Sequence, residues 1–170
     1  FGGAMQAVAH LVKNGHTRIA WVGPTAEGIQ GLERWAGVQA GLRKANLTMP
    51  TELMLSSIDK AAIRALLSRD DRPTGVVAPW TSVASRVLHA GLELGLRPGS
   101  ELEVVGWCPE EFYRQTRDML PPGQMIPQVV WSIRDMAEAC IARLAERRAH
   151  PDLHTIRLNI ETRLRLPENH

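Results

Sequence analysis

Cysteine and aromatic residues are scarce in this sequence. Its 170 residues include two cysteines, Cys108 and Cys140, together with one tyrosine, two phenylalanines and five tryptophans. The cysteines form neither a Cys-x-x-Cys pair nor a metal-ligand spacing, so they predict free thiols in a reducing compartment and no disulfide framework. The histidines include no His-Glu-x-x-His pair, and we expect neither a metal site nor any other cofactor.

Long apolar runs and a strong charge of one sign are also absent. No apolar stretch approaches the roughly 18 residues that a membrane helix needs. The amino-terminal FGGAMQAVAH has no basic region ahead of an apolar run, so no secretion signal is predicted, and its lack of an initial methionine suggests a piece of a longer protein. A net charge of +2 argues against strong nucleic-acid binding by this segment, while 44% hydrophobic and 22% charged residues are typical of a globular chain.

Helical and extended apolar patterns alternate along the chain. The spacing of apolar residues predicts helices near residues 4–12, 29–46, 59–68, 81–94 and 130–149. Short apolar runs predict strands near residues 18–23, 53–55, 75–79, 102–106 and 125–126, and alternation predicts an edge strand within 156–166. This order predicts an α/β fold: a doubly wound, mostly parallel sheet with helices on both faces.

Local signals give more detailed expectations for three of these helices. Ile29 and Leu32 begin the apolar stripe of the second helix. Thr81 or Ser82 is expected to cap the start of the helix that follows them. His16, between the first helix and the first strand, is expected to cap the end of that helix.

Five residues are candidates for a ligand site because ligands in such sheets bind beyond the carboxyl ends of the strands. Arg34 lies early in the helix after the first strand, Pro79 and Trp80 follow the third strand, and Trp107 and Cys108 follow the fourth. An indole beside a guanidinium suits a small polar ligand with an apolar face, such as a sugar ring or a nucleobase.

Other roles remain open for these residues. The tryptophans, Trp35 among them, can fill the core where strands meet helices, and Arg34 can pair with Glu33 or a neighbour at the surface. The glycine loop at 23–28 has neither the Gly-x-Gly-x-x-Gly spacing nor a Gly-Lys-Ser/Thr ending, no Gly-x-Ser-x-Gly elbow occurs, and no histidine is placed to activate Cys108, so we expect no enzyme. A nucleotide-using α/β enzyme, with phosphate bound at 23–28, is the alternative from another class.

The order of short motifs along nearly the whole chain resembles the LacI/GalR family of bacterial transcription regulators. The matching segments are HLVKNGHTRIA at 10–20, RWAG at 34–37, PTGVVA at 73–78, LELGLRPGSELEVVGW at 92–107, QMIPQ at 124–128 and ETRL at 161–164. No single motif is specific, but their shared order is.

The resemblance implies a periplasmic-binding-protein-like type I effector domain, in which two lobes close on a small molecule. Residues 1–123 and 155–170 would form most of the carboxyl-terminal lobe, and residues 124–150 the crossover and one helix of the amino-terminal lobe. The helix-turn-helix domain would lie outside this chain, so operator DNA would be bound only through that missing part. The resemblance further implies a cytoplasmic homodimer, with the helix Thr81–Glu93, Phe112 and Tyr113 at its interface. An extracytoplasmic sugar-binding protein of the same fold is the runner-up.

Arg34 matches the family arginine that contacts the effector. Pro79 and Trp80 stand where the family usually has Asn-Asp, and Cys108 stands where an effector-binding Asp usually follows. These departures argue against a plain pyranose effector. They favour a more apolar, aromatic or carboxylate-bearing ligand, such as a sugar acid, paired with Arg34, and leave open a member with altered or no effector response.

Overall fold

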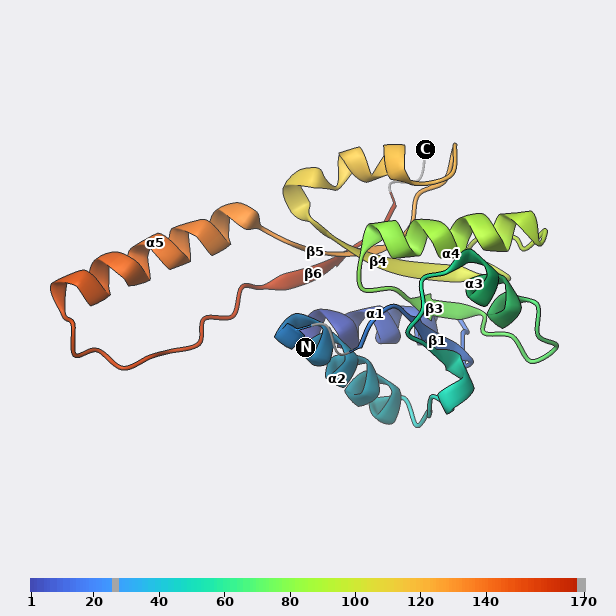
Figure 1. The fold of residues 1–170 in the computed structure, drawn as a ribbon, viewed down its shortest axis with the longest axis horizontal. Helices are drawn as coiled ribbons and strands as arrows, with labels where there is room; N and C mark the ends of the chain where they lie inside the picture. Colours follow the sequence, from blue (N-terminus) through green and yellow to red (C-terminus); the bar gives the residue numbers. More distant parts are fainter. Residues whose placement is uncertain (26–27, 168–170) are drawn as a thin grey trace.

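The computed structural model describes residues 1–25 and 28–167 as one α/β layer with a long arm (Figure 1). Three short 3₁₀ turns (Thr51–Leu53, Glu110–Phe112 and Arg114–Met119) accompany the main elements. In chain order these are α1 (Gly2–Lys13), β1 (Ile19–Val22), α2 (Gly28–Lys44), β2 (Met54–Leu55), α3 (Lys60–Leu67), β3 (Gly75–Val77), α4 (Thr81–Glu93), β4 (Glu103–Pro109), β5 (Gln128–Trp131), α5 (Ile133–Ala149) and β6 (Thr162–Arg165).

The described strands form one sheet in the order β2-β1-β3-β4-β5-β6. The first five strands of that order are parallel, with Val77 opposite Val105, and β6 runs antiparallel to β5. Helices α1 and α2 cover one face and α3 and α4 the other (Figure 1), each face with its own buried apolar cluster. The predicted doubly wound, mostly parallel sheet is therefore confirmed, and the carboxyl ends of β1, β3, β4 and β5 meet at one edge.

Helix α2 buries a different face from the one predicted. Ile29 and Leu32 are 75% and 60% exposed, whereas glycines share the buried face with Val38 and Leu42. A Cβ added at Gly37 would lie 2.3 Å from the Phe1 carbonyl oxygen. The prediction was wrong because close contact between α1 and α2 requires small residues, which carry no hydrophobic signal.

The region around β5 also differs from the sequence prediction. The strand is Gln128–Trp131 and not 125–126, so Val130 belongs to the sheet and not to the helix. Helix α5 begins at Ile133, because the Ser132 side chain accepts a hydrogen bond from the Asp135 backbone N–H at 3.0 Å.

Beyond β5, the chain extends away from the sheet as α5 and returns along residues 150–161 to β6 (Figure 1). No residue of α5 is buried, and the regular part of the predicted edge strand is limited to Thr162–Arg165. None of the described helices is both long and apolar enough to cross a membrane. The assignment of these parts to two lobes stays a prediction.

Candidate functional site

The candidate site is a guanidinium surrounded by three indoles at the carboxyl edge of the sheet. The Arg34 Cζ atom lies 4.1 Å from the centroid of the Trp80 ring, 5.5 Å from that of Trp107 and 5.7 Å from that of Trp131. All three distances lie within the range of cation–π attraction. The structure thus brings together Arg34, Trp80 and Trp107, as the sequence predicted, and adds Trp131.

Each of these side chains is held by a different element. Arg34 lies in the second turn of α2, Trp80 precedes the first residue of α4, and Trp107 and Trp131 lie in neighbouring strands, β4 and β5. The Thr81 hydroxyl does not cap α4 as predicted, since Trp80 occupies the cap position without a side-chain bond. Instead it lies 2.9 Å from the Trp107 carbonyl oxygen and 2.6 Å from Gln128 Oε1, which joins α4 to both strands.

The Arg34 guanidinium has no anionic partner among residues 1–25 and 28–167. Its Nη1 donates to the Pro79 carbonyl oxygen at 2.5 Å, while the neighbouring Glu33 pairs with Arg157. Burial lowers the pKa of Arg34 from its ordinary value to about 10, because removal of water disfavours the charged form. The alternative of an Arg34–Glu33 surface pair is wrong for this structure.

Two cavities open on this cluster and share Trp107 and Trp131. One, of about 360 Å³, includes Arg34, with Gln30 and Asn159 among its polar side chains. The other, of about 520 Å³, is lined by Trp80, Cys108, Phe112, Met119 and neighbours, and is largely apolar. Both volumes are within the range of about 300–1,000 Å³ usual for small-molecule sites.

The remaining predicted site residues have different surroundings. Pro79 is buried and contributes its carbonyl oxygen to Arg34. Cys108 is 4% exposed, and burial raises the pKa of its thiol to about 11 against the smaller opposing effects of Thr81 and Arg165. Cys108 is therefore a neutral wall of the larger cavity and not an activated nucleophile.

Trp35 and the glycine loop do not contribute to the cluster. Trp35 packs edge to face on Trp21, with ring centroids 5.7 Å apart, so for Trp35 the core alternative is confirmed. The proposed phosphate position at 23–28 falls partly on residues 26–27, outside the described residues. Its first residue, Gly23, accepts a hydrogen bond at its carbonyl from Trp21 Nε1 at 2.7 Å.

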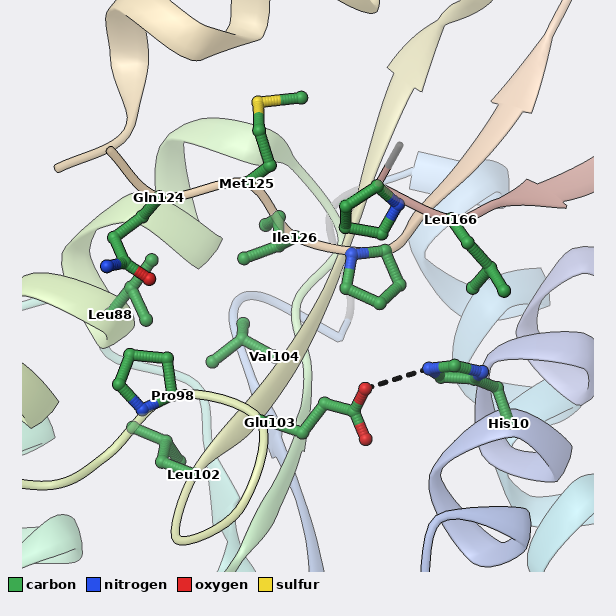
Figure 2. A pocket seen from close by; sticks show the side chains of 13 residues that line it. His10, Leu88, Pro98, Leu102, Glu103, Val104, Gln124, Met125, Ile126 and Leu166 are labelled. Carbon is green, nitrogen blue, oxygen red and sulfur yellow. Dashed lines mark hydrogen bonds and ion pairs between the residues drawn. The ribbon is translucent and has the colours of Figure 1, made fainter. Parts of the chain in front are cut away.

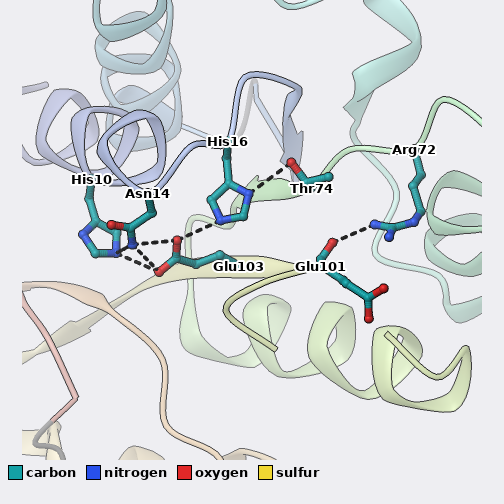
Figure 3. Close-up of polar contacts among 7 residues, drawn as sticks. All are labelled: His10, Asn14, His16, Arg72, Thr74, Glu101 and Glu103. Atoms are coloured by element: carbon teal, nitrogen blue, oxygen red, sulfur yellow. Dashed lines mark hydrogen bonds and ion pairs between the residues drawn. The ribbon is translucent and has the colours of Figure 1, made fainter. Parts of the chain in front are cut away.

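The opposite, amino-terminal edge of the sheet holds a second polar cluster (Figure 3). The carboxylate of Glu103 lies 2.8 Å from His10 Nε2 and 3.1 Å from His16 Nε2, and Asn14 Nδ2 donates to both of its oxygens. His16 is buried, with Nδ1 3.1 Å from the Thr74 hydroxyl. His16 caps α1 as expected, since its backbone N–H donates to the Leu11 carbonyl oxygen at 3.0 Å. Its side chain has a second role that the sequence did not predict, because it links the end of α1 to β3 and β4.

A third cavity, of about 370 Å³, lies beside this cluster (Figure 2). Leu88, Leu102 and Ile126 line it, and His10 and Glu103 lie at its polar end, bonded to each other. No group of three His, Cys, Asp or Glu side chains is arranged to hold a metal ion within the part of the chain that the structure describes.

The two predicted interface aromatics differ in exposure. Phe112 is 47% exposed, beside the larger cavity. Tyr113 is 4% exposed; its hydroxyl donates to the Leu166 carbonyl oxygen at 3.2 Å, and the Arg165 guanidinium lies over its ring. Tyr113 is thus a core residue and not an interface residue, because the carboxyl-terminal segment covers it.

Comparison with known proteins explains this architecture. A family model described as a periplasmic binding protein-like domain matches residues 8–166. The chain belongs to this family. Its curated relatives include the HTH-type transcriptional repressor PurR of Mannheimia succiniciproducens, 28% identical over 89% of this chain and 45% of the relative. Another is the catabolite control protein A of Priestia megaterium, 28% identical over 61% and 33%. The chain thus spans less than half the length of either relative.

Solved structures agree with the family assignment. The transcriptional regulator CelR in complex with cellobiose superposes with a TM-score of 0.82 at 25% identity, over 97% of this chain and 50% of that one. The regulator CcpA of Lactococcus lactis superposes with a TM-score of 0.74 at 20% identity, over 96% and 60%. The resemblance to LacI/GalR regulators inferred from the sequence is confirmed.

Trp131 is the site residue that the sequence analysis missed. The apolar residues of β5 continue at helical spacing into α5, so the sequence pattern predicts a helix where the end of the strand lies. The Ser132-x-x-Asp135 pattern is a helix-start signal and would have moved the boundary.

Proposed function

We propose that this chain is the ligand-sensing part of a LacI/GalR-type transcription regulator. A small metabolite binds at the carboxyl edge of the sheet, between Arg34, Trp107 and Trp131, and shifts the domain toward a closed state that changes operator affinity. The observation that carries the proposal is the guanidinium with three surrounding indoles at the edge where ligands bind in this fold. The domain binds its ligand without transforming it.

The names of the relatives favour a regulator over an extracytoplasmic sugar-binding protein. PurR and catabolite control protein A are both regulators, and each is more than twice as long as the part that this chain matches. That extra length would supply a helix-turn-helix domain, through which operator DNA is bound in the cytoplasm, and the other lobe. The other lobe would also cover the exposed apolar residues of α5, which include Met136, Ile141 and Leu144.

The test uses the full-length protein and DNA from upstream of its own gene. A ligand found by thermal-shift screening should change the DNA affinity at least several-fold, because a coupling free energy of about 1–3 kcal/mol corresponds to about 5- to 150-fold. Arg34→Gln should abolish the change and keep the DNA affinity of the free protein. A protein that binds the ligand at this site with no effect on DNA affinity contradicts the proposal.

We also propose that a second copy of the protein covers the apolar patch beside α4. Trp80, Phe112 and Met119 are 38%, 47% and 47% exposed around the larger cavity. Apolar patches of this kind, where charged side chains are few, are typical of interfaces. Phe112→Asp should shift the protein toward monomer in sedimentation experiments, whereas Ile58→Asp, a change at an equally exposed residue elsewhere, should not. A dimer unaffected by Phe112→Asp would exclude this patch.

A further inference from the structure

Arg34 brings a positive charge into a site where no described carboxylate pairs with it. Within the described ranges, 1–25 and 28–167, the guanidinium forms no ion pair, and its one hydrogen-bond acceptor is the neutral Pro79 carbonyl. The three indoles attract the cation through their faces but accept no N–H bond from it in this structure. Most of its five N–H donors are therefore available to a ligand.

The other charged groups at this cavity do not offset the positive charge of Arg34. Glu33 and Arg157 both line the 360 Å³ cavity, and they neutralise each other in an ion pair. Cys108, on the far side of Trp107, is a protonated thiol because its burial raises its pKa to about 11. Among the described side chains that line this cavity, Arg34 therefore carries the one charge that no ion pair neutralises.

A neutral ligand would leave this charge uncompensated when the site closes. Hydroxyl groups accept single hydrogen bonds from a guanidinium, whereas a carboxylate accepts two in parallel and cancels the charge. Enclosing a charge without a partner is costly, and pairing it with good geometry offsets that cost. Burial already lowers the pKa of Arg34 to about 10 before any ligand closes the site, so the position favours an anion.

The residues that line the 360 Å³ cavity indicate which groups a ligand should carry besides its anionic group. Trp131 is partly buried and offers an apolar surface, which suits the face of a sugar ring or an aromatic ring, and the 4% exposed Trp107 forms the wall beside it. Gln30 and Asn159 offer amide groups that can bond hydroxyl substituents. A volume of about 360 Å³ accommodates a ligand of one or two rings.

We infer that the effector is a ring-bearing carboxylate, whose carboxylate group pairs with Arg34 while its ring packs against Trp107 and Trp131. This inference rests on the proposed function for the location of the site, and it adds the chemical class of the ligand. It predicts that an acid binds more tightly than the neutral compound of the same shape.

The experiment compares three acids with their neutral counterparts on the full-length protein. The pairs are D-glucuronate with D-glucose, cellobionate with cellobiose, and 4-hydroxybenzoate with 4-hydroxybenzyl alcohol. Tryptophan fluorescence reports binding directly, because three of the five tryptophans surround Arg34. In at least one pair the acid should bind about 10- to 150-fold more tightly, as expected for a charge-assisted bidentate pair worth about 1.5–3 kcal/mol.

Three variants on the same helix separate the role of Arg34 from a general charge effect. Arg34→Gln should remove the preference for the acid and leave the weak affinity for the neutral compound. Arg43→Gln removes an equal charge from an exposed position of α2 and should leave the preference intact. Arg34→Lys should keep part of it, since lysine keeps the charge but loses the planar pair of donors.

Three results would overturn the inference: no acid binds, every acid binds no more tightly than its counterpart, or the preference persists in Arg34→Gln. These results differ from failure of the proposed function. A neutral sugar that binds here and changes DNA affinity would keep the proposed function and overturn the ligand class. An acid that binds through Arg34 without changing DNA affinity would do the reverse.

Discussion

Each of two edges of the sheet holds an ionisable group that is buried or half-buried. The two groups differ in how many polar contacts the rest of the chain makes with them. At the amino-terminal edge, both oxygens of the Glu103 carboxylate are contacted by His10, Asn14 and His16 (Figure 3). At the carboxyl-terminal edge, Arg34 has a single neutral acceptor from the described chain. The same polypeptide therefore completes the environment of one charge and leaves that of the other incomplete.

This difference separates a structural group from a binding group. A polar network that surrounds both oxygens of a carboxylate fixes the elements that carry it, here α1, β3 and β4. A charged group without a partner costs stability, and it is retained where a ligand supplies the partner. Substitutions at the two edges test whether they differ in this way.

The largest expected effect is the loss of stability in Glu103→Ala. The change leaves the buried His16 and the half-buried His10 without the acceptor that they share, and leaving a buried polar group unsatisfied costs about 1–3 kcal/mol. Urea unfolding at neutral pH measures the free energy of unfolding of the variant and of the unsubstituted protein.

Glu101→Ala is the matched control for Glu103→Ala. Glu101 is two residues away, and its carboxylate pairs with Arg97 at the surface. Surface pairs of this kind contribute little, so the loss should be far smaller. Equal losses in the two variants would show that the Glu103 cluster does not hold the elements together.

A second prediction concerns the absence of negative charge beside Arg34. The pKa of Cys108 is raised to about 11 from an ordinary value of 9.0, so at pH 9 its thiolate fraction should be about 50-fold lower than that of an unperturbed thiol. The ultraviolet difference spectrum between the protein and Cys108→Ser should show the thiolate appearing only near pH 11. A thiolate already present at pH 8 would put an anion at the carboxyl edge of the sheet and weaken the contrast between the edges.

The raised pKa of Cys108 also predicts how the free energy of unfolding changes with pH. Because the folded-state pKa of Cys108 lies above its unfolded value, the folded state binds the proton more tightly, and its stability falls as pH rises from about 9 to 11. Cys108→Ser should lose this part of the pH dependence and keep the rest.

The sequence predicted the contents of the carboxyl edge better than their arrangement. Arg34, Trp80 and Trp107 could be placed together because each follows a parallel strand, and the carboxyl ends of parallel strands meet at one edge. That rule does not reveal which of these side chains form hydrogen bonds or ion pairs, or with which partners. Whether Arg34 pairs with Glu33 or remains open depends on Arg157, a residue distant in sequence that takes Glu33.

The amino-terminal cluster was not predicted for the same reason. His16 gains its role from Thr74 and Glu103, which the folding of β3 and β4 brings to it. The exposed face of α2 was mispredicted because its packing depends on the absence of a side chain at Gly37. Long-range polar contacts and close backbone approaches leave no periodic signal in a sequence, whereas strands and amphipathic helices do.

The smallest expected effect on stability is that of Arg34→Met in the free protein. Two contributions oppose each other: the change removes the cost of holding a desolvated cation, and it also removes the attraction of three indoles and the bond to Pro79. Because cation–π contacts contribute about 0.5–2 kcal/mol, the free energy of unfolding should change by no more than about 1 kcal/mol in either direction. Urea unfolding of Arg34→Met and Glu103→Ala under the same conditions makes the comparison. A loss in Arg34→Met as large as that in Glu103→Ala would mean that both edges serve the fold, since a charge kept for a ligand is one that the free protein can lose without unfolding.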